Sequence, residues 1–145
     1  MMVKLVCLDC GQTNRLPETR LASGPKCGVC GAALLEGKAR DIDPVTLQKA
    51  IRTDDLPLVV DFWAPWCGPC RMMAPEFSKA AAGLRGRARL VKLNTEDHPQ
   101  VSAGFGIRGI PTMIAFAGGK EAARQAGALP AAQIEAFAAR VSPAG

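Results

Sequence analysis

The strongest constraint on this chain is the arrangement of its six cysteines, which form three Cys-x-x-Cys pairs. The first two pairs are Cys7/Cys10 and Cys27/Cys30. Sixteen residues separate Cys10 from Cys27, and a glycine directly follows each pair. Two residues between cysteines let both sulfur atoms turn toward one ion, and glycine allows the positive φ that such a turn needs. The spacer lies within the range of four-cysteine zinc sites. We therefore predict that these four cysteines bind one zinc ion.

Residues 1–40 form a segment of their own kind, in which glycine and proline interrupt any helical or strand periodicity. Such a segment buries too little apolar surface to fold unaided, so we expect a small zinc-ribbon-like module that depends on metal. Four thiolates leave no open coordination position, which makes the zinc structural and not catalytic. Two local disulfides, or four unrelated thiols, are the alternatives.

Residues 41–145 have the periodicity of a folded α/β domain, and we place the domain boundary between residues 40 and 41. The pattern predicts helices over 43–55, 68–83, 98–106 and 129–141, and strands over 56–64, 89–96 and 111–117, with Gly118 and Gly119 turning the chain into a last strand. This order gives a mixed central sheet with helices on both faces.

The third pair, Cys67 and Cys70, lies in WCGPC between a buried strand and a helix. Cys67 falls at the expected N-cap, where free backbone N–H groups and the helix dipole should lower its pKa from about 8.5. Cys70, one turn later, is close enough to form a disulfide. Gly68 keeps the approach open, and Pro69 suits the first helical turn. We expect Cys67 to attack a substrate and Cys70 to resolve the product.

A metal site or a static disulfide would also use a Cys-x-x-Cys pair. A second zinc site lacks ligands, because all the remaining cysteines are used and His98 is the only histidine. A static disulfide stays open, although an exposed strand-to-helix turn is an odd place for one.

The stretches DFWAPWCGPC (61–70), LVKLNTE (90–96) and GIRGIPT (106–112) resemble thioredoxin. Together with the four-cysteine module they resemble the zinc-containing bacterial type, over essentially the whole chain. The resemblance implies the thioredoxin fold and a reductase that acts on protein disulfides.

The resemblance also implies roles for single residues. Asp61 matches the buried acid that exchanges a proton with Cys70, Lys92 matches its partner, and Pro111 matches a cis-proline that faces the two sulfur atoms. From the residues alone, an aspartate in an apolar strand should have a raised pKa. The expected substrate-binding residues are Trp66, Gly68, Pro69, Gly109, Ile110, Pro111 and Gly127.

Charge and hydropathy limit the partners. The net charge is +5, but residues 1–40 hold six basic against three acidic side chains and the remainder twelve against ten. We therefore expect no nucleic acid as a partner.

No apolar run approaches the ~18 residues of a membrane span, and the start does not read as an export signal, so we expect a soluble cytoplasmic monomer. The resemblance implies an NADPH-dependent thioredoxin reductase as electron donor, with no nucleotide or flavin bound by this chain.

Two further functions are compatible with the sequence. A disulfide isomerase or oxidant would use the same cysteines, although Gly-Pro between them favours a reductant. A zinc-dependent redox-sensing or interaction module would react once and not turn over. Every expected catalytic residue lies after residue 40, so we expect residues 1–40 to be dispensable for the chemistry.

Overall fold

The computed structural model describes residues 1–141 of the chain. The strands are β1 (Met2–Val6), β2 (Thr13–Pro17), β3 (Arg40–Asp41), β4 (Leu58–Trp63), β5 (Arg89–Asn94), β6 (Thr112–Ala117) and β7 (Lys120–Ala126). The helices are α1 (Pro44–Thr53), α2 (Gly68–Gly83), α3 (Pro99–Gly104) and α4 (Ala131–Ala139), with a 3-10 turn η1 (Glu18–Arg20). Every helix and strand predicted after residue 40 is present, and the ends differ by no more than two residues.

The main sheet has five strands in the order β3-β5-β4-β6-β7. Strands β3, β5 and β4 run parallel, whereas β6 and β7 are antiparallel to their neighbours. This is the mixed sheet of the predicted thioredoxin fold. The sequence did not predict β3, because a strand of two residues has no period to detect.

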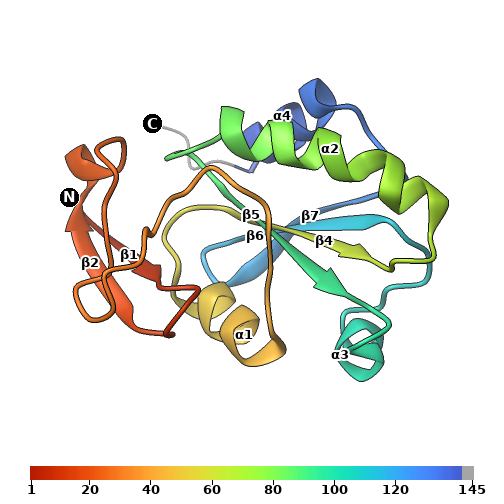
Figure 1. The fold of residues 1–145 in the computed structure, drawn as a ribbon, viewed down its shortest axis with the longest axis horizontal. Coiled ribbons are helices and arrows are strands. Elements are labelled where there is room, and N and C mark those ends of the chain that lie inside the picture. The colour runs from red at the N-terminus through yellow and green to blue at the C-terminus, as the bar shows by residue number, and fades with distance from the viewer. Residues whose placement is uncertain (142–145) are drawn as a thin grey trace.

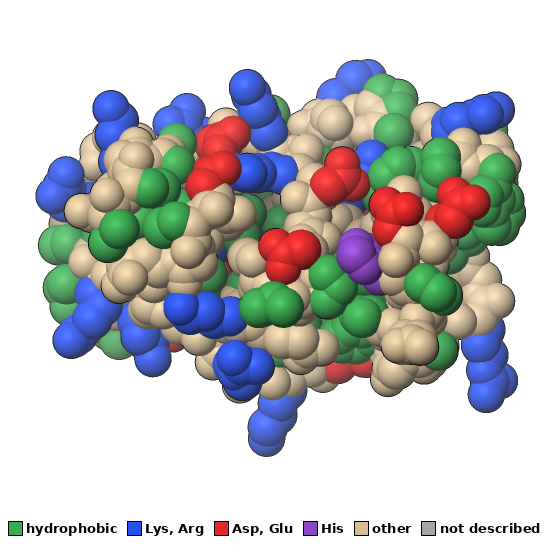
Figure 2. All heavy atoms as spheres, turned by 60° about the horizontal axis from the view of Figure 1, so that its bottom comes forward, with side chains coloured by type: hydrophobic (Ala, Val, Ile, Leu, Met, Phe, Trp, Pro, Cys, Tyr) green, Lys and Arg blue, Asp and Glu red, His purple; other side chains and the backbone are tan. Residues whose placement is uncertain are grey.

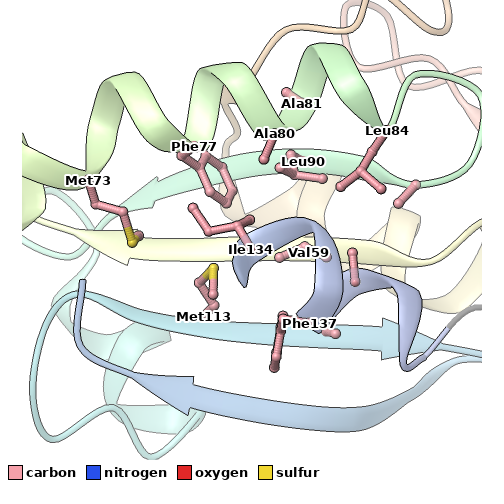
Figure 3. Packing of buried hydrophobic residues seen from close by; sticks show 13 residues of the cluster. Val59, Met73, Phe77, Ala80, Ala81, Leu84, Leu90, Met113, Ile134 and Phe137 are labelled. Carbon is pink, nitrogen blue, oxygen red and sulfur yellow. The ribbon is translucent and has the colours of Figure 1, made fainter. Parts of the chain in front are cut away.

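Helices cover both faces of this sheet (Figure 1). Residues of α2 and α4 pack on one face in a single apolar cluster with β4, β5 and β6, as Figure 3 shows. Phe77, Ile134 and Phe137 are at most 2 % exposed there. The other face packs against α1 and the residues around α3. The α1 helix begins where predicted, because the Asp43 carboxylate accepts a hydrogen bond from the N–H of Thr46 at 2.8 Å.

Residues 1–35 contain a hairpin that the sequence did not predict. Strands β1 and β2 pair antiparallel from Met2–Pro17 to Val6–Thr13. In β1, only Val3 and Leu5 alternate with exposed residues. An alternation of two residues is too short to distinguish a strand from a loop in the sequence. The hairpin has a small core of its own, made by Val3, Leu5, Cys7, Leu16, Cys27, Leu34 and Leu35.

A buried ion pair joins this hairpin region to the main domain. The guanidinium of Arg89, at the start of β5, lies 2.8 Å from the Asp54 carboxylate and donates to the carbonyls of Val6 and Leu34 at 2.9 and 3.0 Å. Asp54 also accepts from the N–H of Val6 at 2.8 Å. The buried charged side chains of the main domain therefore hydrogen-bond to backbone groups of the hairpin region, where water does not reach them.

The hairpin lies at the end of the main sheet opposite the turn between β4 and α2 (Figure 1). On the face drawn in Figure 2, lysine and arginine side chains spread around the rim and do not gather in a stripe. Among the described residues, no helix has the length and apolar character needed to cross a membrane.

Candidate functional site: three cysteine pairs with two kinds of chemistry

Cys67 and Cys70 form a disulfide at the start of α2. Cys67 is the N-cap residue, as predicted, and its Sγ accepts a hydrogen bond from the backbone N–H of Cys70 at 3.2 Å. Cys67 is 5 % exposed and Cys70 is 2 % exposed. The N–H of Cys70, in the first helical turn, thus points at the sulfur of Cys67, where it and the helix dipole stabilise negative charge.

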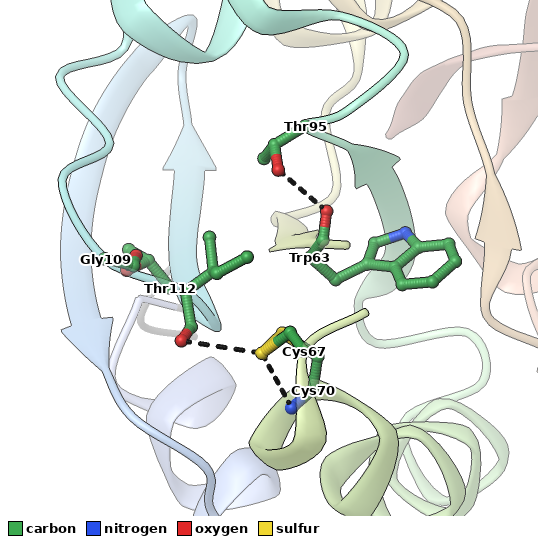
Figure 4. The surroundings of a disulfide bond; sticks show 7 residues. Trp63, Cys67, Cys70, Thr95, Gly109 and Thr112 are labelled. Atoms are coloured by element: carbon green, nitrogen blue, oxygen red, sulfur yellow. Dashed lines mark hydrogen bonds between the residues drawn. A yellow bond between two sulfur atoms is a disulfide. The ribbon is translucent and has the colours of Figure 1, made fainter. Parts of the chain in front are cut away.

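The loop before β6 faces this disulfide across the site. The peptide bond between Ile110 and Pro111 is cis, and the carbonyl oxygen of Ile110 lies 3.8 Å from the Cys67 sulfur. Figure 4 shows Thr112 and Gly109 beside the disulfide, and the Thr112 hydroxyl donates to the carbonyl of Gly109. The expected cis-proline and the two sulfur atoms are therefore neighbours, although they are more than forty residues apart in the chain.

Asp61 is a buried carboxylate of β4, the strand that leads into the WCGPC turn. It is 0 % exposed, and neither carboxylate oxygen has a hydrogen-bond partner among the described residues. Burial raises the pKa of Asp61 to about 7; the positive charge of Lys92 opposes this rise, and the negative charge of Asp41 adds to it. A carboxyl group with this pKa can accept and release a proton at neutral pH.

Lys92 and Trp63 lie beside Asp61. Lys92 pairs in register with Asp61 across β4 and β5, and its Nζ lies 4.3 Å from the centre of the Trp63 ring. The backbone carbonyl of Trp63 accepts hydrogen bonds from the N–H and hydroxyl of Thr95 at 2.8 and 3.0 Å, the latter drawn in Figure 4. These contacts fix the end of β4, from which the WCGPC turn departs.

An open surface surrounds the disulfide. Trp66 is 67 % exposed. It lines a groove with Thr95, Pro99, Ile107, Arg108 and Ile110. A Cβ added to Gly68, Gly109 or Gly127 would meet no atom within 4 Å, so each position leaves space beside the chain.

The remaining four cysteines lie together in the hairpin region. Their sulfur atoms all fall within 4.8 Å of one another, with Cys7 and Cys30 separated by 3.6 Å and Cys10 and Cys27 by 3.7 Å. Four ligands at about 2.3 Å around a tetrahedral zinc ion would lie about 3.8 Å apart. The two local disulfides are absent, since all four cysteines are free thiols. The donor set fits zinc.

Contacts around the four cysteines support this fit. The N–H of Val29 and the side-chain amide of Asn14 point at the Cys27 sulfur at 3.4 and 3.5 Å. Gly11 and Gly31, which follow the two pairs, have positive φ of 81° and 79°. Both features belong to a turn that presents thiolates to one ion.

Geometry alone defines a class of protein. A two-cysteine disulfide at a helix start, next to an exposed tryptophan and preceded by a strand that carries a buried carboxyl group able to exchange protons, is the site of a thiol–disulfide oxidoreductase.

Comparison with known proteins gives the family. Residues 39–140 match the family described as thioredoxin, and residues 6–32 match the family described as thioredoxin 2, N-terminal. Thioredoxin C-3 of Corynebacterium nephridii is 40 % identical over 131 residues, 90 % of each chain. Thioredoxin 1 of Nostoc sp. is 44 % identical over 92 residues, 63 % of this chain and 86 % of that protein. The chain belongs to the thioredoxin family.

Solved structures agree with this assignment. Chloroplastic thioredoxin z is 38 % identical and superposes with a TM-score of 0.66, covering 71 % of this chain and 93 % of that one. The thioredoxin of Malassezia sympodialis is 27 % identical with the same TM-score, covering 75 % and 95 %. The chain is a thiol–disulfide oxidoreductase with an N-terminal zinc ribbon.

Sequence reasoning missed several residues that the structure brings to the site and to the ribbon contact. Thr95 fixes the end of β4, and Asp54 with Arg89 joins the ribbon to the main domain. The charged pair could have been suspected, because Arg89 opens an apolar strand, but its partners are far away in the sequence.

Proposed function

We propose that Cys67 is the nucleophile that reduces disulfides in protein substrates. Its thiolate attacks one substrate sulfur and forms a mixed disulfide, and the other substrate sulfur leaves as a thiolate. The Cys70 thiol then gives up its proton and attacks the Cys67 sulfur, which releases the second substrate thiolate. Two electrons pass to the substrate, and the Cys67–Cys70 disulfide remains. The observation that carries this proposal is that disulfide at the start of α2.

Asp61 is proposed to accept the proton that Cys70 releases. Both residues are buried, and Asp61 lies two positions beyond Val59, which packs against α2 on the same sheet face. Its carboxylate has no hydrogen-bond partner among residues 1–141, so both oxygens are available to take up that proton. Lys92 would stabilise the carboxylate after Asp61 has lost the proton again.

The substrate is proposed to lie between Trp66 and the loop at Pro111. An extended chain there can pair with the backbone of Ile110, a form of strand addition that reads no particular side-chain sequence. Gly68, Pro69, Gly109 and Gly127 would leave room for its backbone. A thioredoxin reductase that uses NADPH is proposed to return Cys67 and Cys70 to thiols, with the cytoplasm as the compartment.

The Asp61 proposal predicts a paired change in activity and stability. Asp61→Asn should slow resolution by about 10²-fold at pH 7, the low end for loss of a general base. It should also raise the free energy of unfolding, by a few kcal/mol above pH 7 and by almost nothing near pH 4. The sign follows from the raised pKa, because between pH 4 and 7 the folded wild type binds the proton more tightly than the unfolded chain.

Stopped-flow reduction of a disulfide substrate and urea unfolding at pH 4.5 and 7.5 measure both effects. Asp97→Asn, at an exposed position after β5, is the matched control. Unchanged resolution in a stabilised Asp61→Asn variant would leave Asp61 as a buried core acid without a part in catalysis.

We further propose one structural zinc ion, held by Cys7, Cys10, Cys27 and Cys30 in a module of residues 1–40. When bound, it supplies cross-linking of the two turns and not catalysis, since four sulfur ligands fill its coordination shell. Elemental analysis should therefore find one zinc per chain in the wild type and in Cys67→Ser, and none in Cys27→Ser. Two zinc ions per chain, or zinc loss from Cys67→Ser, would contradict the division of the cysteines.

A further inference from the structure

Asp41, Lys92 and Asp61 lie side by side in one row across the sheet. Asp41 pairs with Lys92 between the parallel strands β3 and β5, and Lys92 pairs with Asp61 between the parallel strands β5 and β4. Residues paired directly in a sheet point to the same face. The neighbours of Asp41 agree, because Ala39 packs against the cluster beneath α2 whereas Ile42 packs on the opposite face.

The elements packed around Asp61 bring few groups that titrate. Strand β6 places Met113 opposite Asp61, and α4 offers the apolar Ile134. Helix α2 contributes Met73 and the cysteine pair of the active site. Among the described residues, the charged side chains that act on Asp61 are therefore Lys92 of β5 and Asp41 of β3, since Cys67 and Cys70 are joined in a disulfide and carry no charge.

Asp41 is exposed, yet its place at the sheet edge is fixed from both sides. The N–H of Ile42 donates to the carbonyl of Lys92 at 2.9 Å. On the other side, the guanidinium of Arg40 donates to both carboxylate oxygens of Asp9 at 2.9 and 2.8 Å, and to Glu36 at 3.1 Å. Residues of the ribbon and its linker thus hold the strand that carries Asp41.

We propose that Asp41 is a positioning residue, which acts through Lys92 to set the pH at which Asp61 gains and loses its proton. Lys92 is the one cation between two acids, so a charge on Asp41 competes with Asp61 for it and also repels the Asp61 carboxylate directly. Both effects favour protonated Asp61, in the direction that burial already drives it. The proposal rests on the role of Asp61 given above, and it gives the edge strand β3 a part in tuning the reaction.

The test is a direct titration of Asp61 in the oxidised protein by NMR of aspartate labelled with carbon-13 at the carboxyl group. Asp41→Asn should move the midpoint of Asp61 to lower pH by about half a unit at low salt, a size expected for one exposed charge about 10 Å away, which is two strand spacings. The difference should shrink in ~1 M salt, where the screening length is about 3 Å. Glu18→Gln removes the same charge from an exposed position on the ribbon and should leave the midpoint unchanged.

The pH profile of resolution, measured on the same three proteins, separates this proposal from the one it rests on. If the Asp61 midpoint in Asp41→Asn equals that of the wild type, the positioning role of Asp41 is wrong. If the midpoint moves and the kinetic profile moves with it, both proposals hold. If only the midpoint moves, Asp41 tunes Asp61 as proposed, and it is the role of Asp61 as proton acceptor that fails.

Discussion

Cys70→Ser should stop turnover and leave the protein joined covalently to its substrates through Cys67. The attack needs only the Cys67 thiolate at the start of α2, whereas release needs a second thiol one helical turn later. A serine hydroxyl at position 70 cannot displace the substrate from the Cys67 sulfur. We expect turnover to fall at least ~10³-fold, and non-reducing gels or intact-mass measurement should find one substrate per chain.

The controls for this experiment are two further variants. Cys67→Ser should be as inactive but form no adduct, because the remaining Cys70 lies inside the first turn of α2 and lacks the N-cap position that stabilises the Cys67 thiolate. A surface substitution, Arg52→Met, should turn over normally. An adduct that forms equally through Cys70 would reverse the assignment of the two cysteines.

Arg89→Met should destabilise the full chain by about 3–5 kcal/mol, the cost of leaving one partner of a buried ion pair alone. The change removes the contact to Asp54 and the hydrogen bonds to the carbonyls of Val6 and Leu34. Burial already raises the pKa of Asp54, and the positive charge of Arg89 opposes this rise. Without Arg89 the pKa of Asp54 should therefore rise further. The loss should therefore be larger at pH 8 than at pH 5, because at the lower pH the isolated carboxyl group holds its proton.

Urea unfolding at the two pH values measures this effect. Arg52→Met, which replaces an exposed arginine of α1, is the control and should change the free energy of unfolding by less than about 0.5 kcal/mol. A loss in Arg89→Met as small as in the control would mean that the ribbon contributes little to the stability of the main domain.

This contact changes what removal of the ribbon should do. Every residue with a proposed catalytic role still lies after residue 40, so we still expect the chemistry to proceed without the ribbon. Stability is a separate matter, because Asp54 and Arg89 would lose their buried partners along with Val6 and Leu34. The ribbon also lies at the far end of the sheet from Cys67, so any influence on the active site has to pass through the sheet (Figure 1).

Much of the fold was predictable because local signals agreed with one another. Asp43 before Pro44 marks the start of α1, and the apolar run over 58–63 marks a strand covered on both faces. The cysteine spacing predicted the ribbon, although not its hairpin. The zinc-site geometry agrees with that spacing because short turns bring two sulfur atoms together whatever surrounds them.

What the sequence could not provide is the placement of residues distant in the chain. The cis bond at Pro111 was expected from resemblance alone, since an isolated bond of this kind favours trans. The pair Asp54–Arg89 and the row from Asp41 to Asp61 depend on docking and strand register. Neither follows from a local pattern, because strand β3 has only two residues and Asp54 is the C-cap residue of α1, far from Arg89 in the sequence.

The central claim is that this chain reduces protein disulfides catalytically through Cys67 and Cys70. The most direct measurement is the oxidation of NADPH during reduction of insulin, with a thioredoxin reductase and a catalytic amount of the protein. We predict many insulin disulfides reduced per chain for the wild type and none above background for Cys67→Ser. A single NADPH consumed per chain, with no further turnover in excess insulin, would contradict the claim and identify a stoichiometric redox sensor instead.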